Sequence, residues 1–142
     1  MKSPPTSTSV KIQIDGASRG NPGPAGVGVA VSTKAGKRLK ELALYLGEAT
    51  NNVAETCALI IGLQEVLRLG GKQVTVLTDS ELLARQVTGD YRVRDLQLQW
   101  LHALIHHLIS GLDRFEIQHV PRERNRVADR LANRAVAEGL RK

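Results

Sequence analysis

Three strand-like segments in a row, joined by short spacers, are the feature that most constrains the fold of this 142-residue chain. They cover residues 10–15, 25–33 and 38–46. In the first of them, apolar Ile12 and Ile14 alternate with polar neighbours, which is typical of a strand with one buried face. Because the spacers are short, the three segments are predicted to form an antiparallel meander.

Helical and strand-like segments alternate after the meander. They are a helix at 51–69, a strand at 73–79, helices at 80–87 and 95–110, a strand at 114–120 and a helix at 125–138. The order β-β-β-α-β-α-α-β-α contains no internal repeat and predicts an α/β fold, a five-stranded mixed sheet with helices on both faces. A right-handed crossover would place the first and fourth strands parallel to each other at the centre of the sheet.

The composition is that of a single soluble domain. No apolar run approaches the roughly 20 residues that a membrane helix needs. Residues 1–9, rich in Ser, Thr and Pro, lack the apolar core of a secretory signal and are predicted to be a disordered leader before one domain at 10–142. The single Cys57 excludes an internal disulfide and is compatible with a reducing compartment. We therefore expect a cytoplasmic protein without membrane contact, and nothing in the sequence suggests more than a monomer.

Positive charge is concentrated near the C-terminus. The formal net charge is +6 with a pI of about 9.9. Residues 122–142 hold seven basic and three acidic side chains, so +4 of that charge lies there. A basic surface of this kind suits a polyanionic partner. A solvated cationic helix is the alternative that charge alone leaves open.

Four carboxylates fall at equivalent ends of the predicted elements. Asp15 and Asp79 end strands, at the sheet edge where α/β proteins place their sites. Glu55 lies in the first turn of the helix before the second of these strands, and Asp129 in the first turn of the last helix. Carboxylates that converge on one edge repel one another unless cations bridge them, and such oxygen-rich clusters suit Mg²⁺ or Mn²⁺. A pair of these ions can activate water and stabilise the leaving oxygen of a phosphodiester.

Each carboxylate also has a structural interpretation. Asp15 fits a turn before Gly16, and Glu55 fits a capping box with Asn52. Asp79 could be the N-cap of the following helix, and Asp129 could form an ion pair with Arg126. The sequence leaves these alternatives open.

The segment between the first two strands holds more glycine and proline than a hairpin turn needs. Within IDGASRGNPGPAG, four glycines follow Asp15 in close succession. Glycine lacks the Cβ that would hold another group away, so we expect something to approach this backbone closely.

Four sequence blocks now carry a resemblance to a known family. IDGASRGNPGPAG, TNNVAE, LTDS and NRVADRLA, in this order and spacing, resemble the signature blocks of type 1 ribonuclease H. The match runs from Val10 to about Val136. It implies a ribonuclease H-like fold and an enzyme that hydrolyses the RNA strand of RNA/DNA hybrids with two divalent metal ions, leaving 5′-phosphate and 3′-hydroxyl ends.

The resemblance also implies residue roles. Asp15 would bridge both ions, with Glu55 and Asp79 on one and Asp129 on the other. The glycine-rich segment would admit the RNA backbone, whose 2′-hydroxyl distinguishes RNA from DNA. The implied substrate contacts are Gly16, Asn21, Thr50 (a DNA phosphate), Asn51, Asn52, Ser80, Tyr91 (a DNA sugar), Arg122 and Asn125. For Asn51 and Asn52, helix capping is the alternative.

The chain departs from the family pattern in three places. Only residues 89–95 link the two middle helices, where many members carry a long basic insertion that grips the hybrid. His119 lies at the end of a strand rather than in the loop where many bacterial members have a histidine, so we assign it no role. Glu81 stands where relatives often have glutamine, which puts one ribose contact in doubt.

Two rival functions remain at this point. One is a hybrid-binding module of the same fold with little or no turnover, although a pure binder gains nothing from clustered negative charge. The other is a related nuclease or integrase acting on DNA, against which the Asn51–Asn52 pair and the glycine-rich segment argue.

Overall fold

The computed structural model describes residues 9–141, in which five strands form one mixed sheet in the order β3-β2-β1-β4-β5. The strands are β1 (Ser9–Ser18), β2 (Gly23–Thr33), β3 (Arg38–Ala49), β4 (Gln73–Thr78) and β5 (Arg114–His119). The first three pair antiparallel, whereas β1 pairs parallel with β4, and β4 with β5. The predicted meander and the parallel first and fourth strands are confirmed.

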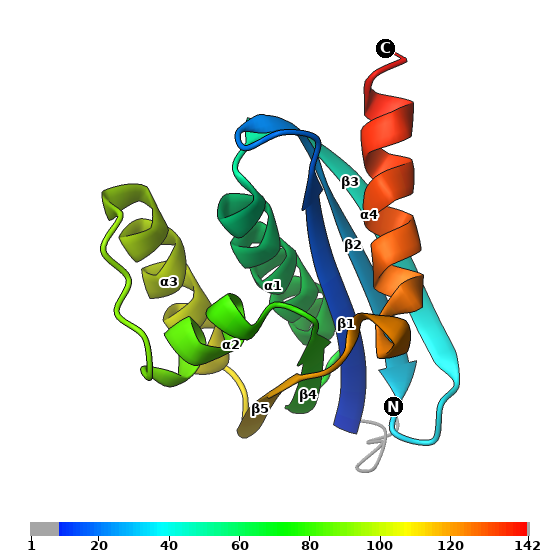
Figure 1. The fold of residues 1–142 in the computed structure, drawn as a ribbon. Coiled ribbons are helices and arrows are strands. Elements are labelled where there is room, and N and C mark those ends of the chain that lie inside the picture. Colours follow the sequence, from blue (N-terminus) through cyan, green and yellow to red (C-terminus); the bar gives the residue numbers. More distant parts are fainter. Residues whose placement is uncertain (1–8, 142) are drawn as a thin grey trace.

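Helices lie on both faces of the sheet, as predicted (Figure 1). They are α1 (Asn51–Arg68), α2 (Glu81–Thr88), α3 (Leu96–Ile109) and α4 (Arg126–Gly139), with a short 3-10 turn η2 (Arg122–Arg124) before the last. Helix α1 packs on β1 and β2 on one face, and α3 packs on α1. Helix α4 packs on β1, β2 and β3 from the opposite face. Strand β1 begins at Ser9, the last residue of the predicted leader, and residues 1–8 lie outside the described residues.

The apolar core fills the space between the sheet and α1. Alternate residues of β1, Ile12 and Ile14, are buried there as the sequence pattern predicts. Leu59 and Leu63 of α1 meet them from the helix side. Burial of this continuous apolar surface fixes the sheet register, because a shift of one residue would turn Ile12 and Ile14 toward the other face.

Glycines in β1 and β2 let the helices approach the sheet closely. A Cβ on Gly16 would lie 2.3 Å from the backbone of Ala54 in α1. On the other face, a Cβ on Gly28 would lie 2.2 Å from the carbonyl oxygen of Ala128 in α4. The protein's own helices thus approach the backbone at Gly16 and Gly28. The contact of the glycine-rich segment with RNA that the resemblance implies stays a prediction.

Helix α4 leaves part of its face of the sheet uncovered. It lies over β1, β2 and β3, toward one side of the sheet (Figure 1). The outward side chains of Gln73 on β4 and of Arg114 and Glu116 on β5 are exposed. Among residues 9–141, no helix is both long and apolar enough to cross a membrane.

Candidate active site

Three of the four predicted carboxylates meet at one edge of the sheet. Asp15 in β1, Glu55 in α1 and Asp79, directly after β4, offer oxygen atoms that lie within 4.8 Å of one another. Glu55 is the fifth residue of α1, so its predicted place in the first turn is wrong by one residue and the carboxylate lies at the start of the second turn. The parallel pairing of β1 and β4 brings Asp15 and Asp79 to the same edge.

Asp129 joins this cluster from α4. It lies in the first turn of that helix, as predicted, and its side chain hydrogen-bonds with Asp15. All four carboxylates line one open pocket of about 470 Å³, which we call the carboxylate pocket. Of the predicted substrate contacts, Gly16, Asn51 and Arg122 line it as well.

Burial and the neighbouring carboxylates raise the pKa values of Asp15 and Glu55. The pKa of Asp15 rises from its ordinary value of 3.8 to about 9, first because the side chain is buried and then because Asp79, Asp129 and Glu55 are close. The pKa of Glu55 rises from 4.5 to about 7, mainly through burial, although hydrogen bonds from the side chains of Ser80 and Asn51 oppose the rise. Ionisation of Asp15 and Glu55 is therefore unfavourable in this cluster, and a bound cation would stabilise the ionised forms.

The capping alternatives for two carboxylates are wrong. The N-cap of α1 is Thr50, whose hydroxyl oxygen accepts a hydrogen bond from the Val53 N–H at 3.2 Å, so Asn52 and Glu55 form no capping box. The N-cap of α2 is Ser80, not Asp79. Neither Glu55 nor Asp79 is thus explained by helix capping.

The structural alternatives for the other two carboxylates are wrong as well. Asp15 lies within β1, opposite Gly28 of β2, and not in a turn. Asp129 does not pair with Arg126. Its Oδ1 lies 3.6 Å from Nη2 of Arg122 and accepts a hydrogen bond from Nδ2 of Asn133 at 3.2 Å.

Asn21 and Asn51 are linked to each other. The Oδ1 atom of Asn21, in the turn after β1, accepts a hydrogen bond from the backbone N–H of Asn51 at 2.9 Å. The same turn is fixed by Ser18, whose hydroxyl donates to the carbonyl oxygen of Ala49 at 2.8 Å. These bonds hold the turn against the N-terminus of α1, beside the pocket. Both asparagines are exposed.

Asn125 is the predicted substrate contact that the structure contradicts. It is fully buried, and its Nδ2 donates to the carbonyl oxygen of Ile14 at 2.9 Å. This bond joins the start of α4, which carries Asp129, to the residue before Asp15. Asn125 therefore holds the start of α4 against β1, and its buried side chain does not face a substrate.

The remaining predicted contacts lie outside the pocket lining. Thr50 and Ser80 serve as N-caps, and Asn52 turns its Oδ1 into the protein interior. Tyr91 is 44% exposed, and the Arg85 guanidinium lies 5.4 Å from the centre of its ring. Their predicted substrate roles stay predictions.

Six lining residues were not predicted, namely Ala17, Ser18, His119, Val120, Pro121 and Asn133. His119 is the informative one, because the sequence assigns no role to this residue at the end of a strand. It is indeed the last residue of β5, but β5 lies parallel to β4 and ends at the same edge as Asp79. The parallel pairing, which the sequence order did not specify for this strand, brings it to the pocket.

Comparison with known proteins agrees with this geometry. The family model described as "Reverse transcriptase-like" matches residues 13–135. The crystal structure of RNase H1 from the halophilic archaeon Halobacterium salinarum superposes with a TM-score of 0.89 at 39% identity, covering 92% of this chain and 98% of that one. The chain belongs to the ribonuclease H family. A second structure, LC11-RNase H1 in complex with an RNA/DNA hybrid, is 41% identical with a TM-score of 0.87, covering 92% and 99% of the two chains.

Some relatives within the ribonuclease H family are much longer. A bifunctional protein of Mycobacterium tuberculosis is 44% identical over 128 residues, which cover 89% of this chain and 35% of that protein. The chain thus spans about a third of the length of this relative.

This member of the ribonuclease H family has a short connection between α2 and α3. Helix α2 ends at Thr88 and α3 begins at Leu96, so residues 89–95 form the whole link, as predicted. The last residue of the link, Asp95, is the N-cap of α3 and accepts a hydrogen bond from the Leu98 N–H at 3.0 Å. The hybrid-gripping insertion implied by the resemblance for other members is replaced by this turn.

Proposed function

We propose that this chain is a metal-dependent endoribonuclease that hydrolyses the RNA strand of RNA/DNA hybrids and leaves 5′-phosphate and 3′-hydroxyl ends. In this proposal residues 10–142 form a single ribonuclease H domain that acts as a monomer in the cytoplasm.

The convergence of Asp15, Glu55, Asp79 and Asp129 on one pocket carries the proposal. The donor set consists of carboxylate oxygens, which Mg²⁺ and Mn²⁺ prefer. The raised pKa values of Asp15 and Glu55 support the fit, because a divalent cation would favour the ionised forms that burial and mutual repulsion disfavour. We assign Asp15 to both of two ions, Glu55 and Asp79 to one, and Asp129 to the other. When bound, such ions supply an activated water and stabilise the leaving oxygen of the phosphodiester.

Side chains around the carboxylates provide the other functions that cleavage needs. Arg122 is 74% exposed and lies at the pocket, where its positive charge attracts a phosphate into an otherwise acidic site. Asn51 lies beside Glu55 in the pocket and lowers the pKa of that carboxyl, which favours its ionised form. His119 lines the same pocket and is a candidate for moving a proton to or from the reacting oxygens.

The RNA/DNA hybrid as substrate rests on the relatives. The structure of LC11-RNase H1, at 41% identity and nearly equal length, contains such a hybrid. In this chain, the exposed turn around Asn21 and the N-terminus of α1 adjoin the carboxylate pocket, and we assign the RNA strand to that surface.

A cleavage assay with a matched variant tests the proposal. An RNA strand labelled at one end is presented in an RNA/DNA hybrid, with an RNA duplex and a DNA duplex as controls, and Mg²⁺, Mn²⁺ or a chelator is added. We expect metal-dependent cutting of the hybrid alone. Asp79→Asn removes one charged group from the reacting centre, so its rate is expected to fall by on the order of 100- to 1,000-fold.

The control is Asp113→Asn, the same chemical change at an exposed residue before β5. It should cut like the wild type, and both variants should keep the wild-type circular dichroism spectrum. Full activity in Asp79→Asn would remove the two-metal argument. If the wild type cuts no substrate but still binds the hybrid, the chain is a binding module and the proposal is wrong.

A further inference from the structure

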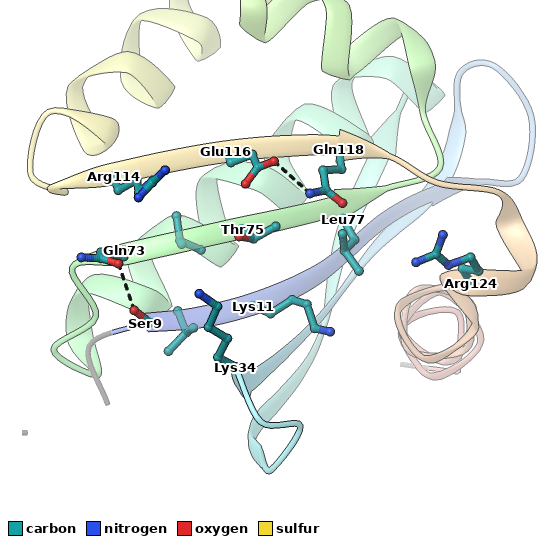
Figure 2. A pocket seen from close by; sticks show the side chains of 12 residues that line it. Ser9, Lys11, Lys34, Gln73, Thr75, Leu77, Arg114, Glu116, Gln118 and Arg124 are labelled. Carbon is teal, nitrogen blue, oxygen red and sulfur yellow. Dashed lines mark hydrogen bonds between the residues drawn. The ribbon is translucent and has the colours of Figure 1, made fainter. Parts of the chain in front are cut away.

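A second concave surface lies on the uncovered part of the sheet, away from the carboxylate pocket (Figure 2). It has a volume of about 450 Å³ and is lined by β1, β4 and β5, by the β2–β3 hairpin and by η2. We call it the basic groove, after its four cations Lys11, Lys34, Arg114 and Arg124. None of these residues belongs to the site proposed above.

The groove carries a net positive charge, because four cations and one carboxylate line it. Its one acidic residue, Glu116, accepts a hydrogen bond from Nε2 of Gln118 at 2.9 Å, and Figure 2 shows the pair turned toward each other on β5. Within the described residues, none of the four cations has a carboxylate within 4.0 Å. All four are exposed. Four unpaired cations around one hollow attract an anion.

The sheet register sets the spacing of these cations. Ser9, Gln73 and Arg114 lie in one row across the strands, and Lys11, Thr75 and Glu116 lie in the next. With strands about 4.8 Å apart and two residues per step of about 6.6 Å, the Cα atoms of Lys11 and Arg114 are separated by about 12 Å. The groove thus suits an extended anion with several charges better than one small ion. Its hydroxyl and amide groups, from Ser9, Thr75 and Gln73, suit a polar backbone.

One short turn, η2, separates the groove from the carboxylate pocket. Arg122, at the start of η2, lines the pocket, and Arg124, at its end, lines the groove. A bound polyanion that extends from the pocket over η2 would therefore reach the cations of the groove. The eight residues before Ser9 contain no Asp or Glu, so this part of the chain does not complement the groove's charge.

We propose that the basic groove binds the phosphate backbone of a single-stranded nucleic-acid tail that extends from the duplex held at the carboxylate pocket. The proposal rests on the proposed function for the position of the duplex, and on the groove alone for the affinity for phosphates. Binding is electrostatic and independent of base sequence, because the groove offers cations and polar groups and no aromatic platform.

The test compares blunt and tailed hybrids. One hybrid duplex is prepared blunt and with single-stranded tails of about ten nucleotides, of RNA or DNA, on either strand. Affinities are measured by fluorescence anisotropy with chelator present, so that nothing is cut. The variant Lys11→Gln/Arg114→Gln removes two groove cations. Lys40→Gln/Arg134→Gln, at exposed positions outside the groove, is the matched control with the same loss of charge.

We expect at least one tailed hybrid to bind the wild type about three- to tenfold more tightly than the blunt one, as two or more exposed charge contacts would give. The groove variant should lose this gain, and the slope of log K against log salt should fall by about 1.4, two contacts at about 0.7 each for a single strand. The control variant should keep the gain.

Three outcomes would overturn the proposal. One is equal binding of blunt and all tailed hybrids by the wild type. Another is a groove variant that weakens blunt and tailed hybrids alike. The third is displacement of a groove-dependent probe by an acidic peptide such as oligoglutamate but not by single-stranded DNA, which would assign the groove to a protein partner.

Cleavage of the blunt hybrid reports separately on the proposed function. It should be the same in the wild type and the groove variant. Binding of a free labelled single strand, measured with both proteins, tests the groove even if no hybrid is cut.

Discussion

Strands β1, β4 and β5 run from one surface of the molecule to another of opposite charge. Their first halves carry the basic groove, with Lys11 on β1 and Arg114 on β5. Their far ends carry the carboxylate pocket, with Asp15 on β1 and Asp79 after β4. The cations of the groove are exposed and surround a part of the sheet that α4 leaves uncovered. The pocket forms where α1 and α4 pack closely on the sheet.

This difference separates two kinds of functional surface. In the pocket, charge is buried and the backbones of β1, β2, α1 and α4 touch without intervening side chains, so a substitution changes stability and chemistry together. In the groove, the cations are solvated and make no ion pairs within the described part of the chain. Their removal should change binding and leave the fold intact.

The largest expected effect is on the contact that holds α4 to the sheet. In Gly28→Ala the new methyl group would meet the Ala128 carbonyl oxygen and the backbone nitrogen of Ala132, so α4 must move away. Overpacking of this kind costs about 3 kcal/mol of unfolding free energy. Because Asp129 follows Ala128, cleavage should fall as well. Urea denaturation and the cleavage assay measure the two effects.

Gly111→Ala is the matched control for this substitution, because its Cβ would meet its nearest neighbour at an ordinary 3.5 Å. It should unfold within about 0.5 kcal/mol of the wild type. Equal stability of Gly28→Ala and Gly111→Ala would contradict the role of close helix packing in building the pocket.

A smaller, pH-dependent effect is expected from Asp15. Its folded-state pKa of about 9, against an ordinary 3.8, means that the metal-free folded protein keeps a proton that the unfolded chain releases. This contribution to stability is complete below pH about 4 and is lost as pH rises toward 9. Asp15→Asn cannot ionise, so its melting temperature should exceed that of the wild type by about 5 °C near pH 8 and converge with it near pH 4.

Thermal melts in chelator across this pH range measure the difference. Mg²⁺ should raise the wild-type melting temperature at pH 8 and have little effect on Asp15→Asn. Asp113→Asn, at an exposed site, should follow the wild type. A difference in melting temperature between the wild type and Asp15→Asn that stays constant with pH would show that ionisation of Asp15 does not destabilise the fold.

The smallest effect is expected in the groove. Lys11→Gln/Arg114→Gln should change the unfolding free energy by no more than about 0.5 kcal/mol, because exposed charges without partners add little to stability. The same urea denaturation series measures it. A loss comparable to that of Gly28→Ala would mean that these cations support the fold, and the contrast between the two surfaces would disappear.

The order of the elements and the four carboxylates could be predicted from the sequence because both leave local signals. Alternation in β1 and the apolar stripe of α1 indicate their structures directly. The resemblance to ribonuclease H places Asp15, Glu55, Asp79 and Asp129 at one site, and the structure brings them into one pocket. Element ends were less predictable. Strand β3, expected at 38–46, continues to Ala49 because its last residues pair with the first residues of β2.

Two residues lie where the sequence does not predict them, for one physical reason. The resemblance implies a substrate contact for Asn125, but its side chain is buried against β1. The sequence assigns His119 no role, but β5 ends beside Asp79 and His119 lines the pocket. In both cases the local pattern was correct and the direction of the side chain depended on a partner far away in the sequence.

The sequence by itself determined which segments become strands and helices, which side chains carry charge and which family the chain resembles, since periodicity and motif spacing are properties of neighbouring residues. Only the tertiary structure decided which backbones touch through Gly16 and Gly28, and which face of the sheet stays uncovered. Close packing and burial depend on elements that meet from distant parts of the chain, and those contacts turn four separate carboxylates into a pocket and four separate cations into a groove.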